Sequence, residues 1–239
     1  MATTYLDIMN RCLRKLGETE LAGSSTDIET DYQKLLGQMI NDVKEEVEDA
    51  TNWRSLRQVV TPIVLAGTGS IGISEGNERS RLVRLYQSES MSGYLPLVFD
   101  VTDATTPDPL HELDLSELLY RQQVDPDTRV ESPTYFALDN SGDGDDLDIY
   151  VYPLCTADRT LQVTLTIPQP RLEDDELTTV IKAPARPIFV GTMWHAYEER
   201  GEELGPDALF SEKRFMEALN TAVSRDEAES GDRIELIIS

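Results

Sequence analysis

The sequence has little positive charge. Its 21 lysines and arginines are outnumbered by 45 aspartates and glutamates, which gives 239 residues a formal net charge of −24 at pH 7. An acidic surface repels phosphate, and no part of the chain gathers basic residues into a patch. Tight binding of nucleic acid by charge neutralisation is therefore disfavoured.

Cysteine and long apolar runs are also scarce. The chain has two cysteines, Cys12 and Cys155, which we interpret as small buried residues in a reducing compartment rather than as a disulfide or a reactive thiol. No charged-then-apolar leader opens the chain, and no run of about 18 apolar residues occurs. We expect a soluble protein that carries no export signal and has no membrane partner.

Sequence motifs of catalysis are missing as well. There is no G-x-S-x-G motif, and the GTGSIG stretch at 67–72 lacks the third glycine of a dinucleotide loop and the lysine of a phosphate loop. His111 and His195 show no ligand spacing with the cysteines. We interpret the acid-rich stretches 44–49 and 172–177 as the polar face of a helix and a loop, both solvated. The sequence predicts no enzyme, no cofactor and no metal site.

One acidic loop resembles part of a calcium site. Asp139, Ser141, Asp143 and Gly144 match the first, third, fifth and sixth places of an EF-hand loop, but Tyr150 occupies the twelfth, where a bidentate glutamate is needed. We interpret the stretch as a polar turn between strands. A calcium- or carbohydrate-binding β module of a virion or surface protein remains an alternative, as does a glycan hydrolase with paired carboxylates.

The first part of the chain has helical periodicity. A threonine–aspartate capping box predicts a helix from Thr4 to Leu16. Thr26 with Glu29 three residues on predicts the start of a longer helix that ends near Trp53.

The last part of the chain is helical again. Pro184 and Pro187 predict the start of a third helix, from about 187 to 203, because proline is tolerated in a first helical turn. The Gly-Pro pair at 205–206 predicts a turn, and a fourth helix follows.

Between these helices the pattern alternates with a period of two. Short β-rich runs separated by Gly, Pro, Asn and Asp fill residues 56 to 180, with a short helix at 114–123 among them. We therefore predict an α+β fold in which both ends of the chain form a helical bundle, residues 1–55 and 184–230. An antiparallel β domain, residues 56–183, is inserted in the bundle, and residues 231–239 form a C-terminal arm. The predicted bundle core comprises Leu13, Leu36, Ile40, Trp53, Met193, Tyr197, Phe215 and Leu219.

Several local patterns, taken in order, resemble the head-to-tail connectors of tailed bacteriophages. The opening LDIMNRCLRKLGETEL and the later NWRSLRQ are similar to the family's first helix ending Leu-Gly and to the Trp that starts its β part. SPTYFALD followed by LDIYVYPLCTADRTLQVTLTIPQPRLEDDE resembles its strand, proline turn, strand and acidic exit. PARPIFVGTMWHAYEERGEELGPDALFSEKRFMEAL resembles its closing helical hairpin, which breaks at Gly-Pro. The family is the adaptor type known from short-tailed phages as tubular tail protein A or tail accessory factor.

This resemblance implies a structural role in the virion. The helical bundles would pack side by side as a ring of twelve on the portal protein, and a tail tube or nozzle protein would attach to the β domain. Genomic DNA would pass through the centre without tight binding, during packaging and ejection. The protein would be part of the neck, assembled in the host cytoplasm.

The apolar ending of so acidic a chain fits such a role. In the connector family the segment after the last helix reaches into the portal, and a free β-prone strand can add to the edge of another sheet. The alternative is that this strand pairs with the chain's own β domain. The predicted portal-binding arm comprises Asp232, Arg233, Ile234, Glu235, Leu236, Ile237, Ile238 and Ser239.

Overall fold

The protein, seen in a computed structural model, consists of two compact units. The helical unit comprises residues 1–56 and 169–231, and the β unit is built on residues 57–168. The structure describes residues 3–22, 28, 30–86, 94–96, 98–103, 105–139, 147–200 and 206–230, with the backbone alone at 84–86, 94–96, 206–210 and 230. The mixed α+β composition agrees with the sequence prediction.

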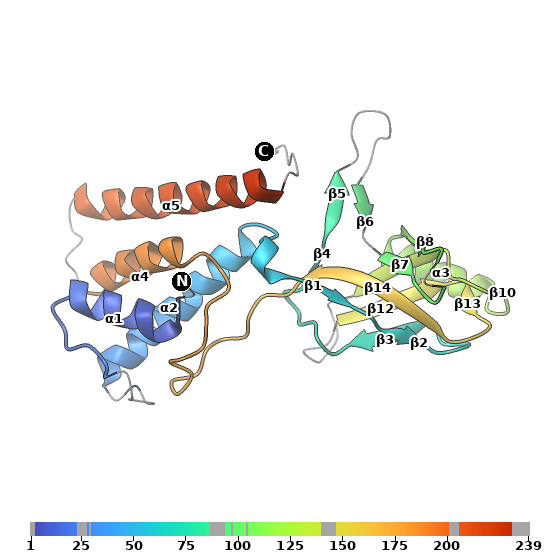
Figure 1. Cartoon of the computed structure of the whole chain (residues 1–239), viewed down its shortest axis with the longest axis horizontal. Helices are drawn as coiled ribbons and strands as arrows, with labels where there is room; N and C mark the ends of the chain where they lie inside the picture. Colours follow the sequence, from blue (N-terminus) through green and yellow to red (C-terminus); the bar gives the residue numbers. More distant parts are fainter. Residues whose placement is uncertain are drawn as a thin grey trace. The chain divides into compact units, whose positions relative to one another are not determined.

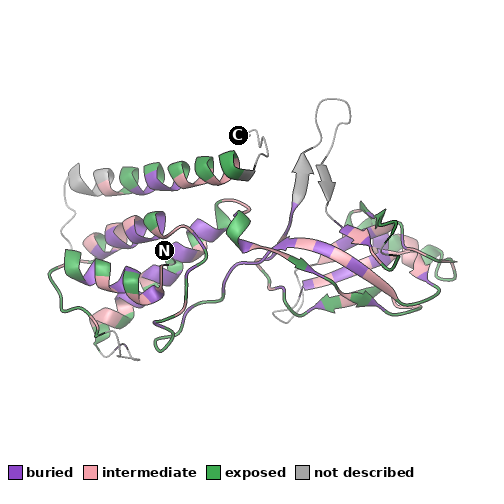
Figure 2. Cartoon of the chain, in the orientation of Figure 1, coloured by how far each residue is buried: buried purple, intermediate pink, exposed green. Residues whose placement is uncertain are grey.

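Four helices from the two ends of the chain share one hydrophobic core in the helical unit (Figure 1). They are α1 (Tyr5–Lys15), α2 (Asp31–Asp49), α4 (Ala185–Glu199) and α5 (Pro206–Ser230), and a 3-10 turn, η1 (Arg54–Leu56), follows α2. Helix α4 contacts α1, α2 and α5, so it is the central element of this unit. Figure 2 shows buried residues along α2 and α4, whereas most of α5 is exposed or half-buried.

Local capping chemistry sets the helix starts. The predicted capping box of Thr4 and Asp7 opens α1. Helix α2 begins later than predicted, because Thr30 and Gln33 form a second capping box: the Gln33 N–H donates to Thr30 Oγ1 at 3.1 Å, and the Thr30 N–H donates to Gln33 Oε1 at 3.0 Å. The predicted start at Thr26 was therefore wrong.

Helix α4 also differs from its predicted bounds of 187 to 203. It begins at Ala185 and ends at Glu199. Pro187 falls in the first turn, where its missing N–H forfeits no intrahelical bond. At the other end, the Arg200 guanidinium donates to the carbonyl of Leu16 at 3.1 Å, which ties this end of α4 to the end of α1.

A glycine allows α4 to pack closely against its neighbours. A Cβ added at Gly191 would lie 2.6 Å from Val43 Cγ1 on α2 and 3.0 Å from the Phe215 ring on α5. Because real Cβ atoms do not approach so closely, the contact of the three helices depends on the missing side chain. The predicted pattern of apolar residues on α4 and α5 did not include this position.

The predicted core residues lie within the helical core, with one exception. Seven of them are buried, whereas Tyr197 is only half-buried and packs against the edge of the core. The buried seven are Leu13, Leu36, Ile40, Trp53, Met193, Phe215 and Leu219.

In the β unit, two sheets contribute to a second core. Strand β14 (Arg159–Thr166) is central in a six-stranded sheet and pairs with four antiparallel neighbours. Strand β12 (Leu147–Tyr152) belongs to a four-stranded sheet. Alternate side chains of both strands are buried in this core, as the period of two requires. They are Leu161, Val163 and Leu165 of β14 and Leu147, Ile149 and Val151 of β12.

The remaining strands complete these sheets and two small pairs. The six-stranded sheet holds β1 (Arg57–Val60), β2 (Ile63–Val64), β4 (Arg81–Leu82), β7 (Val98–Asp100), β8 (Asp108–Pro109) and β14. The four-stranded sheet holds β3 (Ser70–Ile73), β9 (His111–Glu112), β11 (Tyr135–Asp139) and β12. The pairs are β5 (Arg84–Tyr86) with β6 (Tyr94–Pro96), and β10 (Arg129–Val130) with β13 (Leu154–Cys155).

The short helix predicted at 114–123 is present as α3 (Leu115–Val124). The Asp114 side chain accepts from the Ser116 N–H at 2.9 Å and caps its start. Helix α3 packs on β11 and β12, and its Leu118 is buried. The strand pairings are mainly antiparallel, as predicted, but β9 with β11 and β10 with β13 are parallel.

Replacing Trp53 tests the core of the helical unit. Its ring is buried and its Nε1–H donates to the carbonyl of Val47 at 2.6 Å. We expect Trp53→Ala to lower the free energy of unfolding of this unit by about 3–5 kcal/mol, and urea unfolding followed by helical circular dichroism measures it. Tyr120→Ala, at an exposed position on α3, is the control and should change stability by less than about 0.5 kcal/mol. Equal urea midpoints of unfolding for Trp53→Ala and Tyr120→Ala would contradict the placement of Trp53 in this core.

Candidate assembly site

The predicted portal-binding arm, residues 232–239, lies outside the described residues. So do Ser141, Asp143 and Gly144 of the acidic loop, whose flanks are the antiparallel strands β11 and β12 rather than helices. The contacts described below therefore belong to the helical unit up to the end of α5 and to the surface of the β unit.

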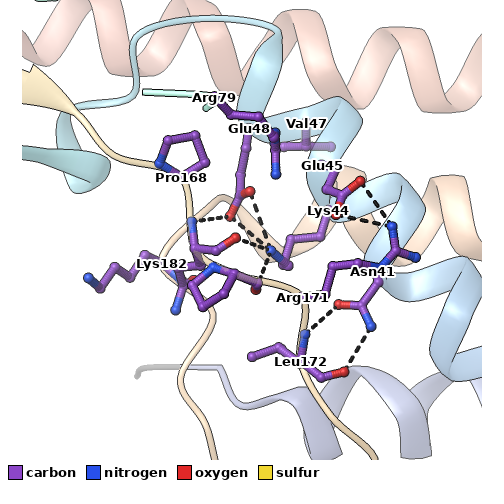
Figure 3. A network of polar contacts seen from close by, with 12 residues as sticks. Asn41, Lys44, Glu45, Val47, Glu48, Arg79, Pro168, Arg171, Leu172 and Lys182 are labelled. Carbon is purple, nitrogen blue, oxygen red and sulfur yellow. Dashed lines mark hydrogen bonds and ion pairs between the residues drawn. The ribbon is translucent and has the colours of Figure 1, made fainter. Parts of the chain in front are cut away.

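A buried ion pair fixes the chain where it returns from the β unit (Figure 3). Lys44 and Glu48, one turn apart on α2, are both fully buried and lie 3.3 Å apart. The Lys44 ammonium also donates to the carbonyls of Gln169 and Pro170, at 2.9 and 3.0 Å. The Glu48 carboxylate accepts from the Gln169 N–H at 3.3 Å. This helix face was predicted to be solvated, which is wrong for these two residues.

Further bonds hold the next two residues, Arg171 and Leu172, against α2 (Figure 3). The Asn41 side chain is matched to the backbone of Leu172: it accepts from the N–H and donates to the carbonyl, each at 2.9 Å. Nearby, the Arg171 guanidinium donates to Asp42 and Glu45. The return segment, as we call residues 169–183, is thus part of the helical unit and not of the β part in which it was predicted.

The return segment also completes the start of α1. The first N–H groups of a helix have no partner within it. Here the N–H of Tyr5 donates to the carbonyl of Thr179 at 2.9 Å, and that of Leu6 donates to the carbonyl of Leu177 at 2.8 Å. The return segment therefore connects α1 with α2, although its sequence shows neither helical nor strand periodicity.

A groove of about 280 Å³ lies on the helical unit between the start of α4 and the second half of α5. Its apolar wall consists of small side chains and one aromatic ring, which leaves room for side chains from elsewhere. The apolar lining residues are Trp53, Pro184, Ala185, Pro187, Ala218 and Ala222.

Charged side chains and Thr221 line the rest of this groove. Asp226 and Glu229 of α5 are both engaged by Arg54: Asp226 accepts from its N–H at 3.1 Å, and Glu229 pairs with its guanidinium. Arg186 and Arg225 also line the groove and are exposed. The sequence did not predict this site, because its residues come from three separate segments.

The β unit has an apolar stripe at one sheet edge. Val59, Ile63 and Leu65 lie at alternate positions along β1, β2 and the residue that follows, and they are 57, 51 and 55% exposed. Among the described residues, β1 and β2 pair with no strand other than β14. Exposed apolar side chains along a sheet edge are typical of an interaction surface. The alternation predicted a strand, but it could not show that the side chains outside the core would be apolar and uncovered.

The cysteines agree with their interpretation as buried residues. Both are free and buried, and burial raises the pKa of the Cys12 thiol to about 12 and the pKa of the Cys155 thiol above its usual value. A thiol with so high a pKa is a poor nucleophile. In the part of the chain that the structure describes, no helix is long and apolar enough to cross a membrane.

The buried ion pair gives a test of the return segment. Lys44→Met would remove the ammonium from Glu48 and from two backbone carbonyls, so we expect a loss of about 3–5 kcal/mol in the free energy of unfolding. Lys44→Met/Glu48→Leu should lose less, because no buried carboxylate is then left behind. Urea unfolding measures both, with Lys15→Met at an exposed position of α1 as control. A Lys44→Met variant as stable as the control would show that Lys44 does not hold the return segment against α2.

Comparison with known proteins bears on what such a molecule does. No curated protein matches the chain. The family model described as SU10 adaptor protein matches residues 3–235, which is nearly the whole chain. This match agrees with the predicted resemblance to phage head-to-tail adaptors. The chain belongs to the SU10 adaptor protein family, and it is a structural component of a phage virion.

Proposed function

We propose that this protein assembles as a ring of twelve beneath the portal, extends the DNA channel and provides the attachment surface for the tail. The family match over residues 3–235 is the observation that carries this proposal. In this assignment the helical unit forms the ring next to the portal, and the β unit faces the tail. Both are compact units with their own cores, so each can present a separate surface.

The β unit offers a surface suited to a tail tube or nozzle protein. The edge formed by β1 and β2 carries the exposed apolar side chains of Val59, Ile63 and Leu65, and among the described residues no further strand covers it. Such an edge can accept a strand, with backbone hydrogen bonds giving affinity and alternate side chains giving specificity. We infer that tail attachment uses this edge.

The charge of the chain supports a channel that does not hold DNA. A net charge of −24 gives the surface no general attraction for phosphate. The genome could then slide during packaging and ejection, whereas tight binding would stop it.

The arm, residues 232–239, supplies the contact with the portal in this proposal. Burying Ile234, Leu236, Ile237 and Ile238 would contribute about 1.5–3 kcal/mol each before the cost of ordering the segment. Repetition around a ring would strengthen attachment by avidity.

The assembly state gives the first test of this function. Like charges repel, so at low salt we expect the isolated protein to be largely monomeric and to form a ring only with the portal. Analytical ultracentrifugation of the protein alone and mixed with its portal measures this. A stable ring without the portal, or a specific DNA complex at physiological salt, would contradict the proposal.

Shortening the arm gives the second test. Deleting residues 232–239 should leave the protein folded and weaken its binding to the portal, because the proposed contact is lost. Leu236→Asp/Ile237→Asp should act almost like the deletion, since a buried carboxylate without a partner costs several kcal/mol. Leu236→Ile/Ile237→Leu keeps the apolar character and should bind normally. Co-sedimentation with the portal measures all three, and unchanged binding by the deletion variant would show that the attachment surface lies elsewhere.

A further inference from the structure

Two arginines line the groove on the helical unit without a partner in the described part of the chain. The acidic lining residues, Asp226 and Glu229, are engaged by Arg54. Arg186 and Arg225 are exposed, and no hydrogen bond or ion pair joins either of them to a described residue, although the chain has 45 acidic residues. Two arginines beside an apolar wall are complementary to a segment that carries both carboxylates and an aliphatic side chain.

The return segment carries this combination on its surface. Its turn at 173–176 is held by two bonds: the Glu173 N–H donates to Glu176 Oε2 at 2.8 Å, and the Glu176 N–H donates to the carbonyl of Glu173 at 3.0 Å. Asp174 and Asp175 lie between them and are exposed. Val180, a few residues further on, is 44% exposed. Two carboxylates are thus presented on a fixed backbone, together with one uncovered aliphatic side chain.

The groove and this turn lie on different sides of the helical unit. Helix α4 lies between α2 and α5, because a Cβ added at Gly191 would meet Val43 of α2 and Phe215 of α5. The groove is formed on the α5 side of α4, whereas the return segment is bound to α2. Figure 1 shows α5 along one side of this unit and the return segment looping out on the other. A copy therefore does not place this turn in its own groove.

We propose that the turn at 173–176 of one copy docks into the groove of the next copy and so joins the subunits of the ring. Asp174 and Asp175 pair with Arg186 and Arg225 of the neighbour, and Val180 lies against the apolar wall. A contact between two different surfaces of one chain is heterologous, and it forms a ring when the rotation between successive copies closes. For twelve copies this rotation is about 30°, so the two surfaces have to lie on nearly opposite sides of each copy, which their placement across α4 allows.

This contact also opposes the repulsion between copies. It joins two cationic and two anionic side chains in a protein whose net charge is −24. Exposed ion pairs contribute little individually, so the contact is weak between two free copies and becomes effective when the portal holds copies side by side. The inference therefore rests on the proposed function, which takes the portal as the template of the ring.

Disulfide trapping of the full chain on its portal tests the contact. One variant carries Asp175→Cys on the turn, and the other carries Thr221→Cys in the groove. The native cysteines are buried and do not compete. We expect a covalent dimer when the two variants are mixed, and almost none from either variant alone. In the control, Asn220→Cys replaces Thr221→Cys; this position is exposed on α5 but lies outside the groove, and it should trap much more slowly.

The failure of this contact can be told apart from the failure of the proposed function. If a ring forms on the portal and the mixed pair traps no faster than the control pair, the ring uses another surface and the inference is overturned. A dimer from Thr221→Cys alone would place two grooves face to face, which also overturns it. If no ring forms on the portal, the proposed function fails, and the mixed variants at high concentration without the portal decide on the contact: the dimer supports it, and its absence overturns it.

Exchanging the charges provides a second measurement without added cysteines. Asp174→Arg/Asp175→Arg and Arg186→Asp/Arg225→Asp should each raise the protein concentration needed for half-assembly on the portal, by about twofold to fivefold for each pair lost. The first of these variants has a smaller net negative charge, so general repulsion alone would predict easier assembly. All four substitutions in one chain keep the net charge and restore the pairs in reverse, which should return assembly toward that of the unchanged protein. Unchanged assembly of both double variants, or no recovery in the folded fourfold variant, would overturn the proposal.

Discussion

The helical unit depends on one buried cation. The Lys44 ammonium is removed from water, and it is stabilised by the Glu48 carboxylate and by two carbonyls of the return segment. A buried charge is tolerated only where its partners are in place, so this lysine requires the return segment to lie against α2. Through that contact, the segment that follows the β unit becomes part of the same core as the first two helices. These hydrogen bonds join α2 to Gln169 and Pro170, which lie in neither a helix nor a strand.

The contact between α2 and the return segment joins the two parts of the helical unit that the β unit separates in the sequence. The chain leaves the helical core after Trp53 and Leu56, which are both buried, and it re-enters at Gln169. Each end of the insertion is thereby fixed to the helical unit. The two units have separate hydrophobic cores.

Periodicity and capping predicted most helices and strands, since they are local properties. The helical stripe of Leu36 and Ile40 and the alternation of β12 each identify a buried face. Thr26 with Glu29 and Thr30 with Gln33 both have the spacing of a capping box. The spacing alone does not show which pair starts α2, and the structure places the start at Thr30. Lys44 and Glu48 flank the apolar stripe of α2, where a charged pair normally lies in solvent. The burial of Lys44 depends on Gln169, 125 positions away, which no local pattern records. The groove was missed for the same reason.

The central claim is that this chain joins the portal to the tail. An electron cryo-microscopy reconstruction of the neck of the phage particle tests it most directly. The account predicts twelve copies between portal and tail, with the helical unit against the portal and the β unit toward the tail. Absence of the chain from the neck, or a β unit in contact with the portal, would contradict it.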